Sequence, residues 1–206
     1  MKLFLFDFDG VLVDSLDVYE KTVTDCLQKI NQPLTRGREE FLELFEGNFY
    51  ESLVKRGVDL DKFMESSVNI LAGVDYSEMK PFSAMLPVLD ELKKNHPLIV
   101  ISSNDTPTIQ EALRLYNFNG IFQEILGSDF MFSKKEKILY AAKKYSAAPS
   151  DIYYIGDTTG DIKEGKQAGI KTVGVTWGWH SKEKMAAAKP DYLFDTPPEL
   201  LQLNEC

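Results

Sequence analysis

Hydrophobic and polar positions change repeatedly between strand-like and helix-like spacing along most of this chain. An aromatic and aliphatic run at 2–8 ends in acidic residues and Gly10, which predicts a buried strand. Further strands are predicted at 98–101, about 122–126, 152–155, 172–175 and 192–194. Helices are predicted at about 83–95, 107–117, 134–146, 160–168 and 182–188, with a last helical turn behind them. Strands alternating with helices predict an α/β fold, a Rossmann-like parallel sheet with helices on both faces.

The segment from 15 to 80 has a different pattern. Apolar residues recur there at helical spacing in four groups, the first of which begins after Ser15, a predicted N-cap. No group has the alternation of a strand. We therefore expect an all-helical insertion after the first strand, with 1–14 and 81–206 forming the α/β core and 15–80 a separate helical unit.

Composition narrows the possible partners. The 206 residues include 23 Lys and Arg against 32 Asp and Glu, a net charge of −9, which argues against nucleic acid or an anionic membrane as the main partner. A small phosphorylated substrate is compatible, because one local cation can reverse the sign of a site. No apolar run approaches the roughly 18 residues of a membrane helix. With only Cys26 and Cys206, the chain has no disulfide framework, which suits a cytoplasmic protein.

Polar residues follow several of the predicted strands. In an open parallel sheet the site lies outside the carboxyl ends of the strands. Those ends, and the start of one helix, carry Asp7-Phe8-Asp9-Gly10, Ser102-Ser103-Asn104, Ser133-Lys134-Lys135 and Gly156-Asp157-Thr158-Thr159-Gly160-Asp161. Carboxylates, hydroxyls and a cation brought together in this way can bind a divalent metal and a phosphoryl group.

The first pair of acids has informative spacing. Residues two apart on a strand point to the same side, so Asp7 and Asp9 can face one reacting centre. Adjacent carboxylates repel unless a metal offsets them or one holds a proton. One acid can then be a nucleophile and the other a proton carrier. The simpler alternative is an acidic strand end that only caps a neighbouring helix.

These segments resemble the four motifs of the haloacid dehalogenase superfamily, most closely its phosphoglycolate-phosphatase-like members with a helical cap. The resemblance runs from Lys2 to about Trp179, and the insertion lies where those relatives carry their cap. The most specific segments are Asp7-Phe8-Asp9-Gly10-Val11-Leu12-Val13-Asp14-Ser15 and Gly156-Asp157-Thr158-Thr159-Gly160-Asp161, the latter followed by Ala168-Gly169.

The resemblance implies roles for the acids. Asp7 would attack phosphorus and form an aspartyl-phosphate, and Asp9 would protonate the leaving oxygen and then activate water. Mg²⁺ would be held by the Asp7 carboxylate, the Asp9 backbone carbonyl and Asp157. Asp161 would orient metal-bound waters or bind the metal directly. Val11 stands where many relatives have threonine, which removes a hydroxyl but leaves both acids.

The resemblance also implies a phosphate-binding set. Ser103 and a lysine would hold the phosphoryl oxygens, and Asn104, at a predicted helix start, would add backbone donors or serve only in capping. Lys134 and Lys135 cannot be separated by spacing, whereas Lys137 lies further into the helix. Solvent exposure at the helix start is expected for two of these three lysines.

The sequence thus predicts a Mg²⁺-dependent phosphatase acting on a small phosphorylated metabolite, as a monomer or weak dimer. A phosphomutase with the same core is the nearest alternative, and a non-catalytic phosphate-binding module is a more distant one. A dehalogenase is disfavoured, because carbon–halogen displacement does not need the proton carrier Asp9.

The helical insertion is expected to form a mobile lid on linkers near 13–15 and 79–81. Arg36, Arg38 and Arg56 are candidates to bind a substrate carboxylate, because arginine binds carboxylates bidentately. Their packing away from the four motifs would defeat the lid hypothesis. No metal role is expected for His96 or His180, because neither has a ligand partner at suitable spacing. The two tryptophans are expected to serve in packing and not as a stacking platform.

Overall fold

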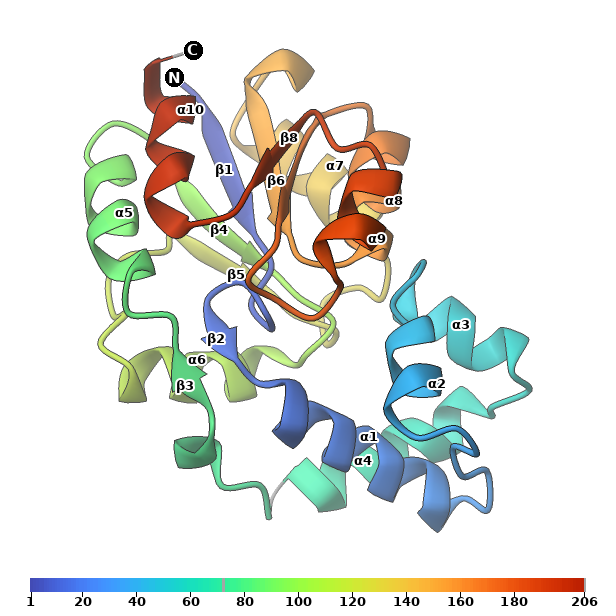
Figure 1. Ribbon diagram of the computed structural model, residues 1–206. Helices are drawn as coiled ribbons and strands as arrows, with labels where there is room; N and C mark the ends of the chain where they lie inside the picture. The colour runs from blue at the N-terminus through green and yellow to red at the C-terminus, as the bar shows by residue number, and fades with distance from the viewer. Residues whose placement is uncertain (72, 206) are drawn as a thin grey trace.

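Six parallel strands form the central sheet, in the order β5-β4-β1-β6-β7-β8 (Figure 1). The computed structural model describes residues 1–71 and 73–205, so Cys206 lies outside the described residues. The strands are β1 Leu3–Phe6, β4 Leu98–Ile101, β5 Glu124–Leu126, β6 Ile152–Gly156, β7 Lys171–Val175 and β8 Tyr192–Phe194. Every neighbouring pair is parallel, which confirms the predicted α/β fold class.

The middle of the sheet is buried on both faces because β1 and β4 are apolar at every position. In β1, Phe4 and Phe6 point to one face, and Leu3 and Leu5 point to the other. The first face packs against α5 (Met85–Leu92), α6 (Thr106–Leu115), the 3₁₀ segment Pro197–Leu201 and α10 (Gln202–Glu205). The second packs chiefly against α7 (Lys134–Lys144), beside which lies α8 (Thr159–Ala168); α9 (Lys182–Ala187) follows β7.

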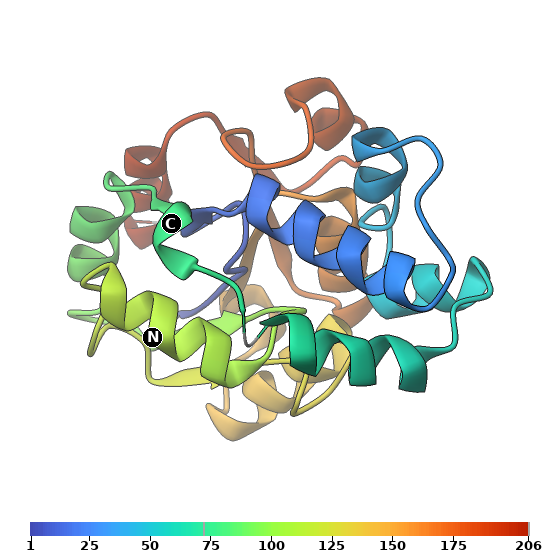
Figure 2. The same cartoon turned by 90° about the horizontal axis from the view of Figure 1, so that it is seen from below.

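Four helices occupy the chain between the first strand and the rest of the core. They are α1 Leu16–Lys29, α2 Arg38–Glu43, α3 Phe49–Lys55 and α4 Leu60–Leu71, followed by a 3₁₀ turn at Tyr76–Glu78. Figures 1 and 2 show α1 and α4 side by side beyond the carboxyl-end edge of the sheet. An apolar core of their own, which includes Leu27, Phe41 and Leu53, holds them together. In the described part of the chain, no helix is both long and apolar enough to cross a membrane.

The two linkers to this helical unit pair with each other. Strand β2 (Val13–Asp14) runs antiparallel to β3 (Lys80–Pro81), as a separate two-stranded ribbon. The sequence predicted two neighbouring linkers but no strand in them, because two residues are too few to show a period. The chain therefore leaves the core and re-enters it at one place.

The helical unit docks on the core through backbone contacts. The amide of Gly160, in the first turn of α8, donates to the carbonyl of Phe45 at 2.9 Å. A Cβ on Gly160 would lie 2.4 Å from the carbonyl oxygen of Gly47, so only glycine allows this approach. His180 adds a second link, with Nδ1 accepting from Thr159 N at 3.0 Å and Nε2 lying 3.1 Å from the Leu42 carbonyl oxygen.

Candidate active site

Asp7 is buried directly behind β1, at the centre of the carboxyl-end edge. Its Oδ1 accepts from the Phe8 amide at 2.8 Å, and its Oδ2 accepts from Lys134 Nζ at 2.7 Å. The chain then turns sharply at Gly10, whose φ is +73°. A Cβ at Gly10 would lie 1.9 Å from Asp157 Oδ2, so the glycine permits this loop to pass against the second acid.

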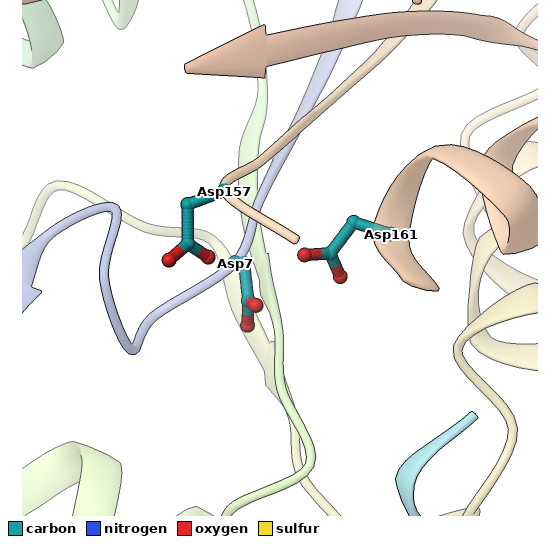
Figure 3. Close-up of side chains that lie close together, drawn as sticks. All are labelled: Asp7, Asp157 and Asp161. Atoms are coloured by element: carbon teal, nitrogen blue, oxygen red, sulfur yellow. The ribbon is translucent and has the colours of Figure 1, made fainter. Parts of the chain in front are cut away.

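Three carboxylates gather at this edge from separate segments. Asp7 follows β1, Asp157 follows β6, and Asp161 lies in the first turn of α8 (Figure 3). One oxygen from each lies within 4.8 Å of the others, and all three side chains are buried. This places three of the four predicted metal-binding acids together. The Asp9 side chain is not a member of the cluster, and its predicted contribution was the backbone carbonyl.

Asp157 and Asp161 differ in how many of their carboxylate oxygens remain free to bind a metal. Asp157 Oδ2 accepts from the Trp179 amide at 2.6 Å, whereas its Oδ1 is buried with no hydrogen-bond partner. A buried, unpartnered carboxylate oxygen is costly unless a cation binds it. Both oxygens of Asp161 are occupied, Oδ1 by Lys134 and Tyr154 and Oδ2 by Thr158, so its bonding suits positioning more than direct metal binding.

The structure distinguishes the three lysines at the start of α7. Lys134 Nζ is buried and contacts both Asp7 Oδ2 and Asp161 Oδ1, the latter at 2.6 Å. The Lys135 side chain is only partly buried and lies outside this contact. Lys137 is fully buried, and its Nζ donates to the Ser102 carbonyl at 2.5 Å.

The expectation of solvent exposure was therefore wrong for Lys137. Residues three apart lie on the same helix face, so Lys134 and Lys137 both turn inward while Lys135 turns away. Sequence reasoning missed Lys137 because it judged only distance from the helix start. The i, i+3 spacing was the signal that could have found it.

Asp9 lines the same small cavity as Asp7 and is held there by the start of α1. Ser15 Oγ donates to Asp9 Oδ1 at 2.7 Å. Ser15 does occupy the N-cap position of α1, as predicted, but its side chain makes no capping hydrogen bond. The hydroxyl thus anchors the acid and not the helix, which links the active-site loop to the first residue of the helical unit.

The loop after β4 brings Ser103 to the site and Asn104 beside it. Ser103 lines the same small cavity as Asp7 and Lys134, and its carbonyl accepts from Tyr50 Oη at 2.7 Å. The Asn104 side chain hydrogen-bonds Asp9 and accepts from the next amide, so it braces the loop without lining that cavity. The predicted helix start here is confirmed, with Asp105 as the N-cap of α6.

The electrostatics of the site favour an added cation. Burial raises the pKa of Asp7 to about 7, although Lys134 opposes the shift, and burial raises the pKa of Asp9 to about 6 against the bond from Ser15. Burial, reinforced by the neighbouring Asp161 and Asp7, also holds the pKa of Asp157 well above its usual range. A divalent cation bound here would offset these charges and favour the ionised acids.

Aromatic side chains from the helical unit close the site. The cavity that Asp7 and Lys134 line measures about 10 Å³, and it is also lined by Tyr19 and Phe45 of the helical unit and by Trp179 of the core. That is room for about one water molecule. Trp179 packs edge-on against Phe45 with ring centroids 4.9 Å apart, so its packing role is confirmed, but it also lines the catalytic cavity. Aromatic residues at helical spacing are equally typical of a core, which is why this lining was not predicted.

The three cap arginines lie elsewhere, so they are not the substrate-binding residues for which they were candidates. Arg36 pairs with Glu43, and Arg38 pairs with Asp17 and Glu20 on the exposed surface. None of the three is among the residues that line the catalytic cavity or the larger cavity beside it.

Arg56 is part of the interior of the helical unit. It binds Glu40 at 2.9 Å and the carbonyls of Gln32 and Pro33. These arginines stabilise loops and helix ends within the unit. The lid hypothesis in the form that depended on these arginines is therefore wrong. Only Tyr19, Phe45 and the docking contacts remain as support for a moving cap.

Comparison with known proteins decides the family. The sequence profile of the haloacid dehalogenase-like hydrolases matches residues 4–175, most of the chain. The chain belongs to the haloacid dehalogenase-like hydrolase family. The matched region contains the loop after β1, the cavity beneath the helical unit and the acids that follow β6.

Relatives of this hydrolase extend over its full length. It is 30% identical to a phosphoglycolate phosphatase of Aquifex aeolicus, over 100% of this chain and 97% of that protein. It is 27% identical to a phosphoglycolate phosphatase of Haemophilus influenzae, over 98% of this chain and 97% of the relative. A predicted phosphatase from Clostridium acetobutylicum has the same fold, with a TM-score of 0.85, 22% identity and full coverage of both chains.

Proposed function

We propose that this hydrolase is a Mg²⁺-dependent phosphatase that cleaves a small phosphate monoester through an aspartyl-phosphate on Asp7. One observation carries the proposal: the Asp7 carboxylate lies between the Lys134 ammonium group and Asp157, which has an unpartnered buried oxygen. A nucleophile, an anion-binding cation and a free metal ligand are the parts that phosphoryl transfer requires. The phosphatase names of its relatives support the assignment.

The residues present fit a bound Mg²⁺. The carboxylates of Asp7 and Asp157 and the backbone carbonyl of Asp9 would hold it, and Asp161 would act on its waters through the network with Lys134 and Thr158. When bound, Mg²⁺ neutralises charge on the phosphoryl oxygens.

The protein groups can perform both half-reactions. In the first, an Asp7 oxygen bonds to phosphorus while the bond from phosphorus to the ester oxygen breaks, and protonated Asp9 gives its proton to that oxygen. In the second, Asp9 takes a proton from water, whose oxygen bonds to phosphorus and releases Asp7. Lys134 and Ser103 would hold the phosphoryl oxygens throughout, and the raised pKa of Asp9, about 6, suits an acid that must gain and lose a proton.

Residues 15–80 would act as a cap that opens and closes on the β2–β3 ribbon. A cavity of about 10 Å³ cannot admit a phosphoryl group, so the helical unit must move before substrate enters. Tyr19 and Phe45 would leave with the cap, whereas the acids and Lys134 stay on the sheet.

Hydrolysis of 4-nitrophenyl phosphate, followed by release of inorganic phosphate, tests the proposal. We expect turnover with Mg²⁺, its loss in excess chelator, and poor replacement by Ca²⁺, which prefers more ligands and looser geometry. Activity that survives the chelator would contradict the metal requirement. Absence of phosphate release under all conditions would favour a strict phosphomutase or a binding module.

A further inference from the structure

A second, larger cavity lies beside the catalytic one. It measures about 320 Å³, within the usual range for small-ligand sites. One wall comes from α1, α3 and α4 and includes Val23, Phe49 and Phe63. The opposite wall is formed by the loops at 103–105 and 128–129, which follow β4 and β5.

This cavity meets the catalytic one at two shared side chains. Tyr19 and Ser103 line both cavities. A phosphoryl group bound against Asp7 and Lys134 would therefore project its leaving group past Ser103 into the larger space. The cavity is placed to select the part of the substrate that leaves.

The charge of the cavity wall is unusual for a site that would bind a carboxylate. Among the described residues that line it there is no lysine, arginine or histidine, while Asp105 and Asp129 both contribute. These two carboxylates are held by protein donors, Asp105 by Thr108 and Asp129 by Thr106. A second carboxylate in this cavity would be desolvated without a counter-charge and would face two acids.

The hydroxyl groups of the wall are also occupied within the protein. Thr22 Oγ1 donates to the Val18 carbonyl at 2.8 Å, and Ser67 Oγ donates to the Met64 carbonyl at 2.8 Å. Tyr50 Oη donates to the backbone of Ser103. The protons of these three hydroxyls are thus directed at backbone carbonyls, which reduces the capacity of the wall to bind a polyol through several hydrogen bonds.

We propose that this cavity selects phosphate monoesters whose leaving group is uncharged and mainly apolar, such as a short aryl or alkyl alcohol, and disfavours those that carry a carboxylate. The proposal rests on the proposed phosphatase function and narrows it. The proposed substrate class therefore differs from phosphoglycolate, the substrate that the names of the relatives suggest, because glycolate would bring a carboxylate to this wall.

Matched esters test the substrate class. Benzyl phosphate, 2-phosphoglycolate and 2-phosphoglycolamide differ in the leaving group, and the last two differ in one charge. With Mg²⁺ present, we expect kcat/KM at least about tenfold higher for the amide than for the carboxylate, with benzyl phosphate highest. Equal or faster hydrolysis of 2-phosphoglycolate would overturn the proposal and leave the phosphatase function intact.

Binding separates the two proposals if turnover is absent. Phenethylphosphonate and 3-phosphonopropionate cannot be hydrolysed, and they carry an apolar aryl group and a carboxylate, respectively. Calorimetry with both compares how tightly the cavity binds these two groups. We expect Kd at least about tenfold lower for phenethylphosphonate. This result without hydrolysis of any ester would refute the phosphatase function and support the ligand class, whereas tighter binding of 3-phosphonopropionate would refute the ligand class.

A variant with an added cation tests the location. Val68 lies on α4 at the rim of the cavity and is 69% exposed, so Val68→Arg should fold. We expect it to raise kcat/KM for 2-phosphoglycolate at least about fivefold relative to benzyl phosphate. Val54→Arg is the matched control, because Val54 is 53% exposed on α3 and lines a different groove. An unchanged ratio in Val68→Arg would show that the leaving group lies elsewhere.

Discussion

The two cavities that meet at Tyr19 and Ser103 have walls of opposite chemistry. The catalytic cavity is small, and carboxylates and a lysine from the sheet edge dominate its wall. The neighbouring cavity is about 320 Å³, and much of its wall is apolar side chains of the helical unit. Many hydrogen bonds between core residues fix the polar side chains around the catalytic cavity. The neighbouring cavity instead lies where the helical unit and the core face each other.

This difference indicates how the molecule separates reaction from selection. Asp7, Asp157 and Asp161 are fixed by strand ends and by core bonds such as Lys134 to Asp161, which do not involve the helical unit. Asp9 is the exception, because Ser15 at the start of that unit anchors it. The apolar wall belongs to a unit with its own core, joined by a two-residue ribbon, so it can change without disturbing the acids. Variants of the two regions should therefore fail in different ways.

The largest expected effect is at the nucleophile. Asp7→Asn should lower kcat by on the order of 10⁴-fold or more, because an amide is a poor nucleophile and a poor metal ligand. Circular dichroism should show a folded protein. Asp25→Asn, an exposed acid on α1, should retain wild-type activity with 4-nitrophenyl phosphate. Near-normal turnover by Asp7→Asn would remove Asp7 from the mechanism.

The second-largest effect is expected at Lys134, with its neighbour Lys135 as the control. Lys134→Ala should lower kcat/KM by about 10³-fold, since it deletes the ammonium group beside the nucleophile. Lys135→Ala, one residue away, should stay within about threefold of wild type, because its side chain does not reach the acids. Steady-state kinetics on both variants gives the comparison. Equal losses would mean that the start of α7, not one ammonium group, supports the reaction.

Lys137 gives a prediction for the dependence of stability on pH. Burial, and then the charge of Lys134, lower the pKa of Lys137 from 10.5 to about 7. Between these values the unfolded chain binds more protons than the folded one, so this group makes stability rise with pH, by up to about 1.4 kcal/mol per pH unit. Denaturant unfolding of wild type and Lys137→Met from pH 6 to 9 should show the extra slope only in wild type. Parallel curves would contradict a neutral buried amine.

The smallest effect is expected where the helical unit touches the core. Tyr50→Phe removes the hydrogen bond to the Ser103 carbonyl and should cost about 1 kcal/mol of stability. We expect kcat for 4-nitrophenyl phosphate to change less than threefold. Tyr140→Phe, which loses two 3.3 Å contacts within the core, with Glu124 and Lys144, is the control. A collapse of kcat in Tyr50→Phe would show that the two regions are not separable.

Much of the core could be predicted from the sequence because topology leaves few choices. Asp7, Asp9 and Asp157 follow buried strands directly, and parallel strands deliver their carboxyl ends to one edge. The strand and helix positions were confirmed with small differences at the ends; the first strand is four residues long and not seven. Asp161 was predicted because it ends the family motif Gly156-Asp157-Thr158-Thr159-Gly160-Asp161, and the structure places it in the first turn of α8.

The cap and the lysines show where sequence reasoning stops. Which lysine turns inward depends on the residue at which α7 begins, and Ser133 as the N-cap fixes that point only in the folded chain. The cap arginines looked like substrate clamps, but acids at sequence separations of 7 to 21 residues neutralise them. The apolar cavity could not be predicted, since its aromatic residues have the same spacing as a helical core.

The most direct test of the mechanism is to trap the enzyme during turnover. Protein mixed with Mg²⁺ and ³²P-labelled benzyl phosphate would be quenched in acid within milliseconds, digested, and analysed by mass spectrometry. We predict label on the peptide that contains Asp7, removable by hydroxylamine as expected for an acyl phosphate, and absent from Asp7→Asn. Rapid phosphate release without a labelled peptide, or label on another residue, would contradict the account.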